Sequence, residues 1–216
     1  MQWLFDPASV QGVTLREDWY IFLIAGICVG VYVYACIFWC ILAYRRRAHP
    51  DPAQFSGNSP LEVTYVVIPL LLVIFLFIVT MRAEMPVDRV NASPANRVRV
   101  AAFRWSWQFS YPGDFTTRGT SVDPPTLYLP VDRSTQIDLV SLDVTHSFWV
   151  PAFLFKRDAI PGRINSFDLT PNRTGTFLSR CAQFCGIDHA LMTFVLKVVP
   201  DAAYDRYVAS RGAITP

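Results

Sequence analysis

The chain has 216 residues, of which 52% are hydrophobic and 17% charged, and its formal net charge at pH 7 is +2. A chain of this length has room for one sizeable domain and an appendage, but not for two full domains. The small charge, with no Lys or Arg run along a predicted face, excludes nucleic acid as a partner. Apolar stretches gather in the first third and a Pro-rich remainder follows, so the first third is the place to look for a membrane anchor.

Two apolar segments are long enough to cross a bilayer core, which is about 30 Å thick. Trp19–Tyr44 carries no charged residue and has charged residues on both sides. It is too long for a cleaved signal peptide, and acidic residues stand where a signal peptide has its basic start. The second segment, Val63–Met81, contains Pro69, which a membrane helix tolerates when neighbouring groups satisfy its backbone. We therefore predict two membrane-spanning helices.

The charges around these segments predict their orientation. The loop between them holds the cluster Arg45–Arg47, whereas the N-terminal tail holds only Arg16. The positive-inside rule therefore places the loop in the cytoplasm and both termini outside. We expect an outer tail at 1–18, a transmembrane helical hairpin at 19–84 and an outer domain at 85–216. The expected location is the bacterial plasma membrane, with the mitochondrial inner membrane as the alternative.

From Arg97 onward the hydrophobic pattern changes to a period of two. Aromatic and polar residues alternate from Phe103 to Tyr111, which predicts one strand with an aromatic face. Further strands are expected at Thr126–Leu129, Gln136–Leu142, Ile164–Leu169, Gly175–Ser179 and Thr193–Val199. Turn residues separate these segments, as is typical of an all-β sandwich or barrel. Asp201–Ser210 is expected to form a short terminal helix behind an N-capping Asp.

The segment from Cys181 to Met192 concentrates metal ligands. It holds two thiols (Cys181 and Cys185), an imidazole (His189) and a thioether (Met192) within a dozen residues. Soft sulfur ligands combined with imidazole suit copper in electron-transfer sites. A mononuclear copper site needs only one Cys. The second Cys would allow two thiolates to bridge two coppers that share one unpaired electron.

Such a pair of coppers requires a second histidine, and the chain has three histidines in all. His49 falls in the predicted cytoplasmic loop, on the wrong side of the membrane, which leaves His146 in the β domain. Two alternatives for the cysteines stay open: a disulfide in an oxidising compartment, and a tetrahedral zinc held with both remaining histidines. A disulfide leaves the His and Met spacing unexplained, and zinc leaves Met192 unused.

Two segments, HSFWVP at His146–Pro151 and CAQFCGIDHALM at Cys181–Met192, resemble the CuA signature of cytochrome c oxidase subunit II. The intervening Lys156–Arg163, the Trp105-x-Trp107 pattern and the two-span anchor resemble that family too. The resemblance covers nearly the whole chain. It implies a cupredoxin-like Greek-key barrel attached to a two-helix transmembrane hairpin.

The resemblance also implies a dinuclear copper centre, CuA, with the side-chain ligands His146, Cys181, Cys185, His189 and Met192. The backbone carbonyl of Gln183 would be a further ligand. The family usually has Glu at this position, where the carboxylate also helps to bind magnesium at the interface with the catalytic subunit. A neutral amide is a poorer ligand for a hard dication. We therefore expect weak or absent magnesium there.

Two further residues take roles from the resemblance. Trp105 would be the point where electrons arrive from cytochrome c, although aromatic residues in a row most often fill a core. Glu62, at the cytoplasmic start of the second span, matches the family's glutamate at the mouth of a proton channel, although a carboxylate at a span end is often only interfacial. The outer domain has more Arg and Lys than Asp and Glu, which argues against steering of a basic soluble cytochrome c. A tethered or fused haem donor in a supercomplex is the alternative.

The expected function is that of the electron-accepting subunit of a proton-pumping terminal oxidase. It would receive electrons from cytochrome c and pass them to haem in the catalytic subunit I, where oxygen is reduced to water. The chain lacks Cys-x-x-Cys-His and so carries no c-type haem of its own. A membrane-anchored copper-storage module is the alternative, and the two-span anchor and Glu62 favour the oxidase. A quinol oxidase subunit would lack the copper ligands.

Overall fold

The structure is a computed structural model that describes residues 6–45, 54 and 56–212. It divides into two compact units, a helical unit at Glu17–Ala83 and a second unit made of Met1–Arg16 and Glu84–Pro216, which we call the β unit. Arg46 and Arg47 of the predicted cytoplasmic cluster, and His49, lie outside the described residues.

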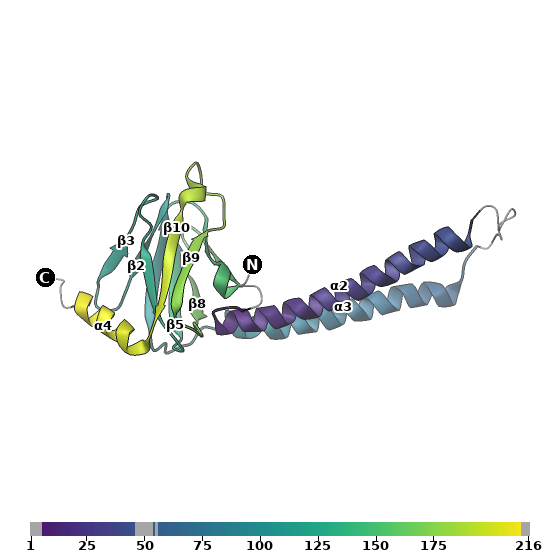
Figure 1. Ribbon diagram of the computed structural model, residues 1–216, viewed down its shortest axis with the longest axis horizontal. Helices are drawn as coiled ribbons and strands as arrows, with labels where there is room; N and C mark the ends of the chain where they lie inside the picture. The colour runs from purple at the N-terminus through teal and green to yellow at the C-terminus, as the bar shows by residue number, and fades with distance from the viewer. Residues whose placement is uncertain (1–5, 46–53, 55, 213–216) are drawn as a thin grey trace. The chain divides into compact units, whose positions relative to one another are not determined.

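Two long helices, α2 (Val10–Ala43) and α3 (Ser59–Asp88), supply the helical unit (Figure 1), and the first residues of α2 and the last residues of α3 are counted with the β unit. Both are long and apolar enough to cross a membrane, and the most apolar stretch of each helix is 0% buried inside the protein. Helices with apolar side chains exposed all round are stable in lipid rather than in water. Both predicted spans therefore form helices, and α2 begins well before Trp19.

The N-terminal segment ahead of the first span is bound to the β unit. The Ala8 amide donates a hydrogen bond of 2.7 Å to the Ala152 carbonyl, and the Ser9 hydroxyl donates one of 3.0 Å to the Phe153 carbonyl. Gly12 packs so closely on this carbonyl that any side chain at position 12 would collide with it. The N-terminal segment therefore lies on the same side of the membrane as the β unit, as the charge pattern predicted.

The β unit is a sandwich of two five-stranded sheets (Figure 1). One sheet has the order β3-β2-β1-β5-β8, with the bounds β1 (Arg97–Phe103), β2 (Ser106–Ser110), β3 (Thr116–Arg118), β5 (Thr135–Ser141) and β8 (Asn165–Leu169). The other has the order β4-β10-β9-β6-β7, with β4 (Thr126–Pro130), β6 (His146–Val150), β7 (Phe155–Ala159), β9 (Gly175–Cys181) and β10 (Thr193–Val199). The helix α4 (Asp201–Gly212) follows β10. The predicted all-β domain and its terminal helix are confirmed.

The expectation of one long aromatic strand was wrong. Phe103 ends β1 and pairs with Ser106 at the start of β2, so the chain reverses at Arg104 and Trp105. Alternation continues through this short turn, and for that reason the sequence pattern conceals it. Trp107 belongs to the fully buried core, whereas Trp105 lies half-buried at the turn.

The strand that carries His146 was not predicted. In β6 four of the five residues are buried, and a strand that is covered on both faces shows no alternation for sequence analysis to detect. Phe148 of this strand packs against Phe194, with ring centroids 5.0 Å apart. Trp107, from the opposite sheet, also packs against Phe194, with ring centroids 5.2 Å apart. This aromatic core fixes β6, and with it His146, in the sandwich.

Candidate metal centre

The loop Cys181–Met192 connects β9 to β10 and is closed at its base by backbone hydrogen bonds. The Cys181 amide donates to the Met192 carbonyl at 2.9 Å, and the Ala182 amide donates to the Ser147 carbonyl at 3.1 Å. Cys181 also pairs in register with Phe148 of β6. The two ends of the loop therefore lie together, beside the first residues of β6.

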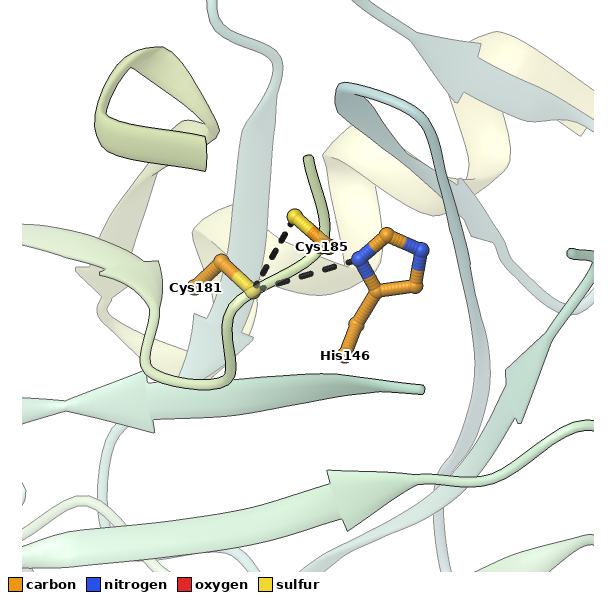
Figure 2. Close-up of side chains that lie close together, drawn as sticks. All are labelled: His146, Cys181 and Cys185. Atoms are coloured by element: carbon orange, nitrogen blue, oxygen red, sulfur yellow. Dashed lines mark hydrogen bonds between the residues drawn. The ribbon is translucent and has the colours of Figure 1, made fainter. Parts of the chain in front are cut away.

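This pairing brings His146 to the two cysteines. In Figure 2 the Cys181 sulfur lies between the Cys185 sulfur and Nδ1 of His146, at 4.0 Å and 3.9 Å. The three ligand atoms all lie within 4.8 Å of one another. His146 is 0% exposed and both cysteines are buried. The structure thus joins two segments that are far apart in the sequence, as predicted.

The remaining predicted ligands of the loop surround the same sulfurs. The Cys185 sulfur is 3.5 Å from Nδ1 of His189 and 3.7 Å from the Met192 sulfur. The Cys181 sulfur is 3.2 Å from the backbone carbonyl oxygen of Gln183. All six residues predicted to bind metal are therefore gathered in one place, and each sulfur has its own set of neighbouring donors.

The donor set fits copper better than either alternative. The 4.0 Å between the sulfurs is about twice the bond length of a disulfide, which is about 2.05 Å. A single tetrahedral zinc takes four ligands and would leave two of the six donors unused. Thiolates, imidazoles and a thioether are the soft and intermediate ligands that copper sites use. Two sulfurs with separate partners have the donors for two such ions.

The two thiols differ electrostatically. Burial raises the pKa of Cys181, but hydrogen bonding with His146 and with the Ser147 amide outweighs it and lowers the pKa. Burial and the neighbouring Cys181 raise the pKa of Cys185 to about 12. Without metal, Cys185 is therefore a neutral thiol at physiological pH. Only thiolates bind metal, so binding has to displace its proton.

We predict that the apparent copper affinity of the full chain rises with pH between 6 and 8. Each proton that copper displaces contributes about tenfold per pH unit, and the proton of Cys185 is displaced throughout this range because its pKa of about 12 lies above it. Copper titrations against a competing chelator would measure this slope. An affinity that does not change with pH would contradict the raised pKa.

Asp143 is a site residue that sequence reasoning did not single out. Its carboxylate oxygen Oδ1 is 2.8 Å from Nε2 of His146, the ring nitrogen that faces away from Cys181. Burial raises the pKa of Asp143, but hydrogen bonds from His146 and from the Arg104 and Val144 amides lower it to about 2. Its position three residues before His146 was the one available signal, and that spacing does not reveal the contact.

Trp105 lies against the metal-binding loop. Its indole Nε1 donates a hydrogen bond of 3.2 Å to the Cys185 carbonyl. A Cβ at Gly186 would lie 3.1 Å from the indole ring, and Gly186 has a φ of 122°, which favours glycine. The ring therefore packs closely against the loop backbone, next to one of the two predicted metal-binding cysteines.

Glu62, the residue predicted to lie at the mouth of a proton channel, is in the first turn of α3 in the helical unit. Its carboxylate accepts a hydrogen bond of 3.0 Å from the Asn58 amide, and the Asn58 side chain accepts one of 3.3 Å from the Leu61 amide. This reciprocal arrangement caps a helix N-terminus. Glu62 therefore has a structural role at the end of the span.

Comparisons with known proteins agree with this arrangement. The family model described as the transmembrane domain of cytochrome c oxidase subunit II matches residues 4–82, and the one described as its periplasmic domain matches residues 113–199. A probable cytochrome c oxidase subunit 2 from Streptomyces avermitilis is 35% identical, over 94% of this chain and 76% of its own length. The chain belongs to the cytochrome c oxidase subunit II family.

Other relatives extend the agreement to structure. A cytochrome c oxidase subunit 2 from Alkalihalophilus pseudofirmus is 33% identical over 96% of this chain and 61% of its own length. The crystal structure of the periplasmic domain of subunit II from Bradyrhizobium japonicum is 28% identical, with a TM-score of 0.51. It covers 57% of this chain and 98% of that domain. The expected cupredoxin-like fold is confirmed.

Family membership defines the role of the chain in its complex. It is a membrane-anchored subunit of a haem–copper oxidoreductase, and its C-terminal domain lies on the outer face of the membrane. Its part in the reaction is to accept electrons for the oxidase, whereas oxygen reduction belongs to the complex. The prediction made from the CuA-like segments is confirmed at this level.

Proposed function

We propose that this chain accepts electrons from cytochrome c into a dinuclear copper centre, CuA, and passes them to haem in the catalytic subunit I. Its side-chain ligands would be His146, Cys181, Cys185, His189 and Met192, with the Gln183 carbonyl. The observation that carries the proposal is the pair of cysteine sulfurs 4.0 Å apart, each beside its own histidine nitrogen.

When bound, the copper pair would hold one transferable electron shared between its ions. The protein supplies the fixed positions of the ligands. Cys181 and Met192 are joined by a backbone hydrogen bond of 2.9 Å, and His146 begins a strand that is packed into the aromatic core. Ligands held in this way change position little between oxidation states, which lowers the reorganisation that electron transfer requires.

We predict that the full chain, solubilised in detergent and loaded with copper, binds two coppers. Its electron paramagnetic resonance spectrum should show hyperfine splitting from two equivalent nuclei, because the two ions would share one unpaired electron. Cys185→Ser should reduce the copper content to one or none. Cys28→Ser, which changes an exposed cysteine in α2, should retain both coppers. One zinc per chain, or a colourless protein with linked cysteines, would refute the proposal.

We also propose that electrons arrive through Trp105. The indole nitrogen donates to the carbonyl of Cys185, so a short bonded path joins the ring to a proposed copper ligand. The nearby loop exposes Phe184 and Ile187, which are 78% and 88% exposed. An exposed apolar patch of this kind suits a cytochrome, soluble, tethered or in a supercomplex, that docks by apolar contact.

Trp105→Phe should slow electron transfer from cytochrome c about tenfold or more, which corresponds to a barrier increase of about 1.4 kcal/mol. Phenylalanine cannot donate to the Cys185 carbonyl. Stopped-flow measurements of donor oxidation would test this, with copper content measured in parallel. The matched control is Trp149→Phe, at a half-buried position of β6. Equal rates for both variants would remove Trp105 from the path.

We propose that Glu62 lies at the mouth of a proton channel into the catalytic subunit, in addition to capping α3. Glu62→Gln separates the two roles, because the amide keeps an oxygen that can accept from the Asn58 amide but cannot carry a proton. Turnover of the oxidase complex should fall severalfold while the copper content stays unchanged. Normal turnover in this variant would leave Glu62 as a helix cap alone.

For Gln183 we propose that the backbone carbonyl binds copper while the side chain binds magnesium weakly or not at all. The carbonyl oxygen lies 3.2 Å from the Cys181 sulfur and does not depend on the identity of the side chain. The exposed amide lacks the charge that favours a hard dication.

A further inference from the structure

Asp143 connects two parts of the molecule that the proposed function uses separately. It precedes β6, and each of its carboxylate oxygens faces a different partner. Oδ1 lies 2.8 Å from Nε2 of His146 and accepts a hydrogen bond of 2.7 Å from the Val144 amide. Oδ2 accepts one of 2.8 Å from the Arg104 amide, and Nε of the same arginine is 3.3 Å away.

The contact with His146 determines which ring nitrogen is free to bind metal. The ring is fully buried, and its Nδ1 faces the Cys181 sulfur at 3.9 Å. A carboxylate on Nε2 keeps the proton of a neutral ring on that nitrogen, so Nδ1 presents a lone pair toward the sulfurs. Carboxylates placed behind a metal-binding histidine also make the ring a stronger electron donor.

The contact with Arg104 reaches the turn that carries Trp105. Arg104 directly precedes Trp105, and its amide is held by Oδ2 of Asp143. The indole is held on its other side by the Cys185 carbonyl. The turn is thus attached both to the metal-binding loop and, through one carboxylate, to the histidine ligand.

We propose that Asp143 is a positioning residue, which orients His146 toward the metal and holds the Trp105 turn in register with the same ligand. This inference rests on the proposed copper site. Asp143 touches no reacting atom and acts through His146 and the Arg104 amide. Its side chain is 22% exposed and its four contacts come from both sides of the carboxylate, unlike a charge that serves only to attract a partner.

The main test is Asp143→Asn in the full, copper-loaded chain. Asparagine keeps only one acceptor oxygen, so it cannot accept from both the Arg104 amide and His146 Nε2 as the carboxylate does. A neutral side chain also makes His146 a weaker donor. Copper affinity should fall about 10- to 100-fold, the range found when such supporting partners of metal ligands are removed. The reduction potential should rise, because a weaker donor stabilises oxidised copper less. Electron transfer from Trp105 should slow.

Two matched variants separate this role from others. Arg104→Ala removes the guanidinium contact but keeps the backbone amide that Asp143 accepts from, so it should lower the copper affinity much less than Asp143→Asn does. Asp123→Asn neutralises an exposed carboxylate of the same unit and should resemble wild type. If Asp143→Asn matches Asp123→Asn, or alters only the salt dependence of donor binding, the positioning role is overturned.

A measurement on the metal-free wild-type chain needs no variant and no copper. Nitrogen NMR of the histidine rings, at a mildly alkaline pH, should show His146 protonated on Nε2 alone. Protonation on Nδ1 would overturn the proposal. If the wild-type chain bound no copper pair, the proposed function would fail while this ring assignment could still hold, so the two failures are distinguishable.

Discussion

The backbone hydrogen bonds of Cys181 and Ala182 are the constraint on which the metal site depends. One closes the loop onto Met192, and the other joins β9 to β6 at Ser147. Side chains from residues 146 and 181–192 meet only because these bonds fix the two ends of the loop and the start of β6 together. By sequence most of the ligands belong to a connecting loop, but the backbone hydrogen bonds to the sheet give them fixed positions.

Burial by the sandwich positions the histidine ligand and also makes free thiolates unfavourable. Aromatic packing of Trp107 and Phe148 places the buried histidine at the end of the core, where water is excluded. Exclusion of water is costly for thiolates, and this cost is the largest cause of the raised pKa of Cys185, with the neighbouring Cys181 adding to it. A bound cation offsets that cost, so a fold that disfavours free thiolates favours a metal in their place.

Much of the site could be predicted from the sequence, because its ligands are rare residue types at close spacing. Cys181, Cys185, His189 and Met192 fall within one short segment, and His146 followed from having few histidines to choose from. The wider contacts could not be predicted in this way. Asp residues are common, so nothing in the sequence distinguished Asp143 from its neighbours before its carboxylate was seen beside His146.

The fold was predictable to a similar extent, and the elements that the sequence analysis missed have physical explanations. Strands with one exposed face, such as β10 (Thr193–Val199), show a clear alternation and were predicted with their observed bounds. The buried β6 shows none. The turn at Arg104 and Trp105 was missed because it contains neither Gly nor Pro and continues the aromatic pattern on both sides.

The bonds between the N-terminal segment and the β unit bear on how the chain is made. Ser9 binds the Phe153 carbonyl 144 residues further along, and both membrane helices lie between them in the sequence. During synthesis this segment emerges before its partners, so it must already lie on the outer side of the membrane when they arrive there. A chain that had crossed the bilayer only once would have Ser9 and Phe153 on opposite sides of the membrane. The hydrogen bond between them therefore forms only after both helices have been inserted.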